Sequence, residues 1–217
     1  MKKGLTELVF ILDKSGSMGG LESDTIGGYN AMLAKQQAVE GECHITTVLF
    51  DNKYELLHDR IDIKAVSPMT EKEYSVGGST ALLDAIGNTI HKIGNAQKHT
   101  ADNYRAEKVM FVIITDGEEN SSREYSPVRV KEMIEHQKTS YGWEFIFLGA
   151  NIDAVETAKR FGISADRAQN YHADSEGVEL NFRVMSEAVA TFRECAAMPE
   201  GWNDEIQKDY NQRGGKR

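Results

Sequence analysis

Oxygen-bearing side chains follow the first apolar segment of this sequence at the point where the segment ends. The segment 8–12 leads directly into Asp13, Ser15 and Ser17, which alternate with other residues. Gly16 lies between the two serines and permits a tight bend, so the three short side chains share one turn. Carboxylate and hydroxyl oxygens suit a hard cation such as Mg²⁺ or Mn²⁺. This turn is therefore a candidate part of a metal site.

Two later loops supply the same kinds of oxygen donor. The apolar segment 109–114 leads through Thr115 into Asp116, and the loop 77–80 ends in Thr80, where a helical pattern begins. Two glycines in that loop would let Thr80 approach the same ion. None of the three loops contains a cysteine or a histidine, so the donors are all oxygen atoms. The predicted metal-binding residues are Asp13, Ser15, Ser17, Thr80 and Asp116.

The elements that must position these residues begin with short apolar runs. Four runs are almost continuously apolar and rich in β-branched or aromatic residues: 8–12, 45–50, 109–114 and 145–148. Such runs are typical of strands in a parallel sheet that has helices on both faces. The segment 54–63 is more polar and follows the second run after a short turn, which predicts a hairpin to an antiparallel edge strand.

Helical patterns alternate with these runs. Apolar residues recur at three- and four-residue steps over 83–93 and 178–192. Ser126 followed by proline predicts the start of another helix, and 154–161 predicts a short helix that ends at Gly162. The alternation of these strands with helices predicts an α/β doubly wound fold. In such folds, sites lie beyond the carboxyl ends of the strands where strand order reverses, which is where the candidate metal residues fall.

The three oxygen-bearing loops together resemble the metal-ion-dependent adhesion site (MIDAS) of von Willebrand factor type A (VWA) domains. Asp13, Ser15 and Ser17 match its DxSxS element, and Thr80 and Asp116 match its later threonine and aspartate in type and order. A DxSxS string alone arises easily by chance, whereas all three elements after the expected strands and helices form a specific signal. The agreement in strand and helix pattern extends over about residues 5–195.

This resemblance implies a particular sheet and a particular role for each residue. The sheet would be six-stranded and mostly parallel, with order 3-2-1-4-5-6, one antiparallel edge strand and helices on both faces. Ser15 and Ser17 would bind the metal directly, and Thr80 would do so in the ligand-competent state. Asp13 and Asp116 would often act through water, although one of them could coordinate directly. A glutamate or aspartate of a partner protein would complete the shell.

Composition and charge narrow the class of protein. The 217 residues are 40% hydrophobic and 27% charged, which is the balance of a globular domain. The formal net charge of −9 argues against nucleic acid and anionic membrane surfaces as partners, because phosphate contacts need clustered Lys and Arg. Cys43 and Cys195 form no disulfide framework, and no run of about 18 apolar residues occurs. These signals favour a cytoplasmic location.

The chain is expected to divide into one VWA-like domain over 1–195 and a polar tail over 196–217. The tail lacks apolar periodicity and contains Pro199, so we expect it to be partly ordered and separable from the fold. Trp202 and Tyr210 are the residues that could dock it onto the domain.

The favoured hypothesis is a non-enzymatic module that binds a partner protein through its metal. A metal-assisted hydrolase or phosphatase is one alternative, but no residue resembles an activated nucleophile or a general base. A metal that only stabilises the fold is the other. Small stand-alone bacterial or phage domains that this chain resembles work with an ATPase or in stress-response operons, so such a partner is expected by analogy. Glu118 and Glu119 either repel an acidic partner or point away and favour a helix N-terminus.

Overall fold

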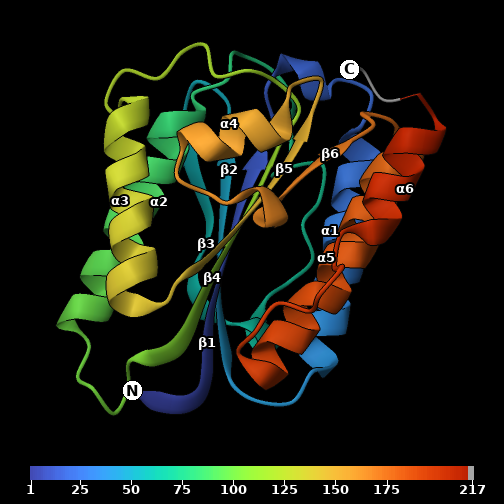
Figure 1. The fold of residues 1–217 in the computed structure, drawn as a ribbon. Helices are drawn as coiled ribbons and strands as arrows, with labels where there is room; N and C mark the ends of the chain where they lie inside the picture. Colours follow the sequence, from blue (N-terminus) through green and yellow to red (C-terminus); the bar gives the residue numbers. More distant parts are fainter. Residues whose placement is uncertain (215–217) are drawn as a thin grey trace.

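The computed structural model describes residues 1–214, which form one six-stranded sheet with helices on both faces (Figure 1). The strands are β1 (Lys2–Asp13), β2 (Cys43–Phe50), β3 (Tyr54–Asp62), β4 (Ala106–Thr115), β5 (Glu144–Ala150) and β6 (Ala168–Tyr171). The helices are α1 (Glu22–Ala38), α2 (Leu82–His99), α3 (Pro127–Tyr141), α4 (Ala154–Arg160), α5 (Ser175–Cys195) and α6 (Asp204–Gln212).

The strand order is β3-β2-β1-β4-β5-β6. β1 pairs in parallel with both β2 and β4, and β3 alone runs antiparallel, beside β2. These pairings confirm the predicted doubly wound sheet and its antiparallel edge. β1 is longer than the apolar run that predicted it, because its pairing with β4 begins at Lys2. The strand order reverses between β1 and β4, so the carboxyl ends of these two strands define the place where a site is expected.

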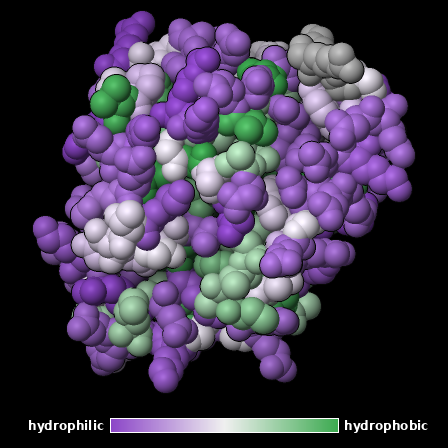
Figure 2. Space-filling view, in the orientation of Figure 1, coloured by the Kyte–Doolittle hydropathy of each residue, from purple (hydrophilic) through white to green (hydrophobic). Residues whose placement is uncertain are grey.

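Two separate cores fill the space between the sheet and its two layers of helices. Figure 1 shows α1, α5 and α6 on one face and α2, α3 and α4 on the other. Successive residues of β1 point to opposite faces, so Phe10 packs beside Tyr29 of α1 while Ile11 packs in the core that contains Ile86 of α2. This two-sided burial explains why residues 8–12 and 109–114 are apolar without alternation. Hydrophilic side chains make up most of the surface seen in Figure 2.

The helix starts follow the capping residues that the sequence offers. Ser126 accepts a hydrogen bond from the backbone N–H of Arg129 at 3.3 Å, and proline takes the first position of α3, as predicted. Gly142 ends that helix in the left-handed conformation, with a φ of 65°. Within residues 1–214, no helix is both long and apolar enough to cross a membrane.

The segment after residue 195 differs from the expected polar tail. Its helix α6 packs against β6 and α5, where Trp202 is 8% exposed and Ile206 is 1% exposed. The indole N–H of Trp202 donates to the backbone oxygen of Asp166 at 2.8 Å. The apolar residues of this segment are too few to give a periodic signal, yet they cover the edge of the sheet. The division at residue 195 stays a prediction, and residues 215–217 of the predicted tail lie outside the described residues.

One carboxyl group lies inside the sheet without full compensation. Glu7 of β1 is fully buried, and its Oε2 accepts from Nε of Arg60 at 2.9 Å and from Nε2 of Gln97 at 3.1 Å. Its Oε1 has no partner among the described residues. Burial raises the pKa of Glu7 from 4.5 to about 7, against the opposing effect of the Arg60 charge.

This carboxyl group should make stability depend on pH. Because the pKa of Glu7 is higher in the folded chain than in the unfolded chain, its contribution is fully present below about pH 4.5 and is lost as pH rises through 7. The variant Glu7→Gln should not lose stability over this pH range in the same way, because its amide does not titrate. Between pH 4 and pH 8, unfolding free energies from urea titrations should shift in favour of the variant by up to about 3 kcal/mol. The exposed Glu107→Gln on β4 should follow the parent, and a parallel course for Glu7→Gln would contradict the prediction.

Candidate metal centre

Asp13 stands at the end of β1, where its carboxylate ties two loops together. Its Oδ2 accepts from the hydroxyl of Thr115 at 2.6 Å and from the backbone N–H of Asp116 at 3.2 Å. Its Oδ1 accepts from the backbone N–H of Ser15 at 2.7 Å. The side chain is 1% exposed. Asp13 therefore fixes the turn after β1 against the loop after β4.

The two serines stand on the turn that follows. Their hydroxyl oxygens lie 3.1 Å apart, with Ser15 buried and Ser17 exposed. Gly16 lets this turn approach the loop before α2, because its N–H donates to the backbone oxygen of Gly78 at 3.1 Å. A Cβ atom at Gly16 would lie only 3.3 Å from that oxygen. The bend that the sequence predicted at this glycine is thus also a close contact between two loops.

Thr80 reaches the same place from the loop before α2. Its backbone N–H donates to Oδ1 of Asn120 at 2.9 Å, and its backbone oxygen accepts from the N–H of Asn120 at 3.0 Å. A Cβ atom built on Gly117 would lie 3.3 Å from the hydroxyl oxygen of Ser17 and 3.4 Å from that of Thr80. The two hydroxyls therefore flank one point beside Gly117. The structure brings together all five residues that the sequence singled out.

Two carboxylates near the centre, those of Glu119 and Asp84, accept hydrogen bonds from backbone N–H groups. Glu119 accepts at 2.8 Å from the backbone N–H of Leu83 in the first turn of α2, and it also bonds the N–H groups of Ser121 and Ser122. This geometry selects the second interpretation of Glu119, a carboxylate at a helix N-terminus. Asp84 accepts from three consecutive backbone N–H groups, those of Arg123, Glu124 and Tyr125. Glu118 is the exposed member of the glutamate pair.

Lys14 is a buried cation beside the centre that sequence reasoning missed. It is 5% exposed, and its Nζ lies 2.9 Å from Oε1 of Glu55 and 3.8 Å from Oδ2 of Asp51. The backbone oxygen of Asp51 accepts from the N–H of Ala81 at 2.8 Å, next to Thr80. Lys14 thus joins the turn after β1 to the β2–β3 hairpin. It also offsets two carboxylates near the site.

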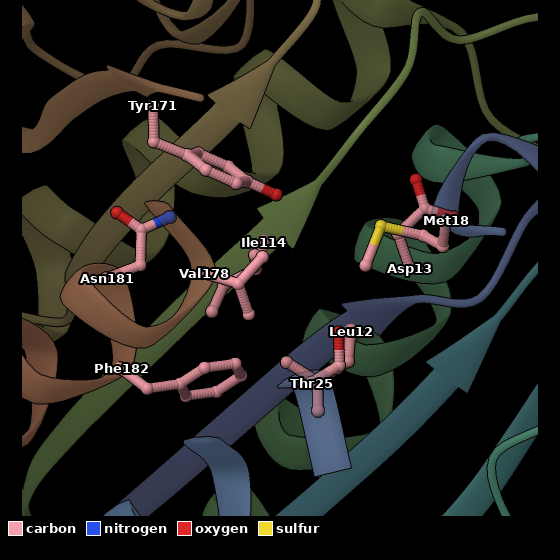
Figure 3. A pocket seen from close by; sticks show the side chains of 9 residues that line it. All are labelled: Leu12, Asp13, Met18, Thr25, Ile114, Tyr171, Val178, Asn181 and Phe182. Atoms are coloured by element: carbon pink, nitrogen blue, oxygen red, sulfur yellow. The ribbon is translucent and has the colours of Figure 1, made fainter. Parts of the chain in front are cut away.

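Two buried tyrosines donate hydrogen bonds to the backbone at the ends of β1 and β4. Tyr74 donates to the backbone oxygen of Asp13 at 2.5 Å, and Tyr171 donates to that of Thr115 at 3.4 Å. Figure 3 shows Tyr171 and Asn181 on one side of a small cavity, across from Asp13. Its volume of about 10 Å³ is room for roughly one water molecule.

The electrostatics of the centre depend on two buried aspartates, Asp13 and Asp116. Burial raises the pKa of Asp116 to about 6, the hydrogen bond from Asn151 lowers it, and the charge of Asp13 raises it. In the part of the chain that the structure describes, neither aspartate forms a salt bridge. Residues 1–214 also contain no group of three His, Cys, Asp or Glu side chains that could hold a metal. Two carboxylates with three hydroxyls form a different donor set, which fits a hard divalent ion.

Asn151 is a second residue that sequence reasoning missed. It follows β5 directly, and its side-chain N–H donates to Oδ1 of Asp116. The signal was available, because the apolar run 145–148 ends three residues before Asn151 and the site lies beyond strand ends. Asparagine is not among the residues that the DxSxS pattern specifies. It was therefore not included in the predicted site.

A doubly wound sheet of order 3-2-1-4-5-6, with an oxygen-rich centre at its switch point, defines a Rossmann-like α/β domain of VWA type. Solved structures share this fold. A von Willebrand factor type A protein from Catenulispora acidiphila is 15% identical, with a TM-score of 0.59 over 85% of this chain and 42% of that chain. Manganese-loaded TRAP protein of Plasmodium vivax is 21% identical, with a TM-score of 0.52 over 69% of this chain and 58% of that chain.

Another similar structure is proximal thread matrix protein 1 from the mussel byssus, with a zinc-occupied MIDAS motif. It is 13% identical, with a TM-score of 0.57 over 85% of this chain and 46% of that chain. This chain spans less than two thirds of the length of each of the three proteins. No family model and no curated protein matches the sequence. At these identities, the likeness shows that the chain has a VWA fold.

Proposed function

We propose that this domain binds a divalent metal ion, Mg²⁺ or Mn²⁺, and uses it to capture an acidic side chain of a partner protein. The observation that carries the proposal is the convergence of the Ser17 and Thr80 hydroxyls on one point beside Gly117, next to a buried pair of aspartates. The manganese-loaded and zinc-occupied relatives of the fold support a divalent ion at this place. The proposed metal-binding residues are Asp13, Ser15, Ser17, Thr80 and Asp116.

The donor set explains why such a centre would bind a partner and not be saturated by the protein. When bound, the ion supplies an electrophilic position that accepts one further oxygen ligand. Ser15, Ser17 and Thr80 contribute neutral hydroxyls, which leave most of the positive charge uncompensated. Asp13 already accepts three hydrogen bonds from the loops around it. Ser17 is exposed whereas Ser15 and Thr80 are buried, which supports an open side of the centre beside Ser17.

The charges around the centre define the kind of acidic partner that fits. Glu119 is committed to the N-terminus of α2, and Lys14 offsets Asp51 and Glu55, so neither group opposes an incoming carboxylate strongly. Glu118 stays exposed and disfavours a broadly acidic surface. We therefore propose one projecting glutamate or aspartate with neutral or basic neighbours. An ATPase or a product of a stress-response operon is the first partner to test, by analogy.

Affinity capture tests this proposal. Partner binding should be lost in chelator and return with Mg²⁺, because a hard cation accepts the carboxylate. Ser15→Ala and Thr80→Ala should each weaken capture while the melting temperature without metal stays close to that of the parent. Ser79→Ala, which changes a neighbouring hydroxyl outside the predicted set, should capture as the parent does. Capture that persists in chelator, both in the parent and in Asp116→Ala, would falsify a metal-dependent mode of binding.

A further inference from the structure

Asn151 is the first residue beyond β5, at the same edge of the sheet as the candidate metal centre. Thr115 pairs with Gly149 in the register between β4 and β5, so the chain that leaves β5 runs level with Asp116. The side-chain nitrogen of Asn151 donates to Oδ1 of Asp116. The loop between β5 and α4 is thus a fourth element that reaches the centre. The DxSxS, threonine and aspartate elements do not include it.

The backbone at Asn151 is held in a conformation that few residues adopt. Its φ of 56° is in the left-handed region, which asparagine enters more readily than other residues with a Cβ. The loop also folds tightly over the end of the strand. A Cβ atom at Gly149 would lie 2.8 Å from Cδ1 of Ile152 and 2.9 Å from Cβ of Ala154. Strained backbone of this kind concentrates at functional sites, where the surrounding structure maintains it.

The hydrogen bond from Asn151 engages one of the two carboxylate oxygens of Asp116. Oδ1 accepts from Asn151, and within residues 1–214 no hydrogen bond reaches Oδ2. The backbone N–H of Asp116 is bound to Asp13, so the main chain at this position is fixed as well. With Oδ1 held, the carboxylate cannot rotate freely about its terminal bond. Oδ2 is the oxygen left for an ion or for water bound to it.

We propose that Asn151 is a positioning residue of the metal centre, which fixes the carboxylate of Asp116 so that Oδ2 serves the cation. The inference rests on the proposed function. An amide suits this task because it donates to a carboxylate and adds no charge. A lysine or arginine in its place would compete with the cation for Asp116. Partners that orient a metal-binding group in this way set metal affinity without touching the metal.

Two substitutions separate this role from a merely structural one. Asn151→Gly keeps the left-handed backbone and removes the amide, so Mg²⁺ binding measured by calorimetry should weaken about tenfold. Asn151→Asp keeps the shape but replaces the donor with a carboxylate beside Asp116. Without metal, the two like charges should lower the melting temperature of this variant. With metal, the added negative charge should make Mg²⁺ binding several-fold tighter. The two variants should therefore change Mg²⁺ affinity in opposite directions.

Asn103→Asp is the control, since it adds the same charge at an exposed position before the amino end of β4, away from the centre and without a hydrogen bond to Asp116. Its Mg²⁺ affinity should stay close to that of the parent. If Asn151→Gly and Asn151→Asp both bind Mg²⁺ as the parent does, the role of Asn151 is refuted while the proposed function stands. If the parent itself shows no saturable Mg²⁺ binding, both proposals fail.

Discussion

Trp202→Ala and Ile206→Ala should each lower the free energy of unfolding by about 3 kcal/mol. Both side chains belong to the core between the sheet and the α1–α5 layer, although they come from the last twenty residues of the chain. The substitution Trp202→Ala would also leave the backbone oxygen of Asp166 without its indole donor. For a chain of this size, the corresponding fall in melting temperature is roughly 10 °C. Thermal unfolding followed by circular dichroism measures it directly.

The control for these variants lies on the same helix. Gln207 is exposed beside Ile206, so Gln207→Ala should melt close to the parent. Deletion of residues from 199 onward removes both core side chains and the ion pair between Arg183 and Glu205, and it should destabilise more than either single variant. A deletion variant that melts like the parent would contradict this prediction and support the separable tail that the sequence alone suggested.

The sheet was predictable because burial leaves a direct record in the sequence. Residues 8–12 are apolar without alternation since both faces of β1 are covered, and the polar segment 54–63 differs because β3 is an edge strand. The C-terminal helix left no such record. Ile206 is the one buried residue of α6, and Trp202 precedes that helix, so no repeat of apolar positions marks the segment. The helix α6 is buried by its contacts with β6 and α5, which come from other parts of the chain and leave no local pattern in its own sequence.

The residues of the candidate site also fall into those that the sequence predicted and those that it missed. The five predicted residues were recognisable because each follows a strand or precedes a helix and carries an oxygen donor. Lys14, Asn120 and Asn151 were missed because their roles depend on which loops meet in space. Asn120 bonds Thr80 from 40 positions away, and Asn151 bonds Asp116 from 35 positions away. Neither partner can be inferred without the register between neighbouring strands.

The convergence of these loops has an energetic consequence that favours a cation. Asp13 and Asp116 are each 1% exposed, and Asp116 donates its backbone N–H to the carboxylate of Asp13. Two buried carboxylates this close repel one another, and desolvation adds to the cost. The nearby Lys14 is directed to Asp51 and Glu55. Within residues 1–214, the structure thus buries two neighbouring carboxylates without a salt bridge to either, so a cation bound between the loops would be stabilising.

Asp116→Ala should therefore abolish the stabilisation of this domain by Mg²⁺. At a Mg²⁺ concentration about a hundred times its dissociation constant, the parent should gain about 2.7 kcal/mol, or roughly 5–10 °C in melting temperature. The variant should show no such rise. Without metal it should be at least as stable as the parent, because the repulsion with Asp13 is gone. Asp116→Asn should behave alike, since the amide keeps the shape but not the charge. Glu179→Ala, which removes an exposed carboxylate on α5, should retain the full response to Mg²⁺. An equal rise in the parent and in Asp116→Ala would place the ion elsewhere on the surface, because a centre built on this carboxylate cannot lose it and keep its affinity.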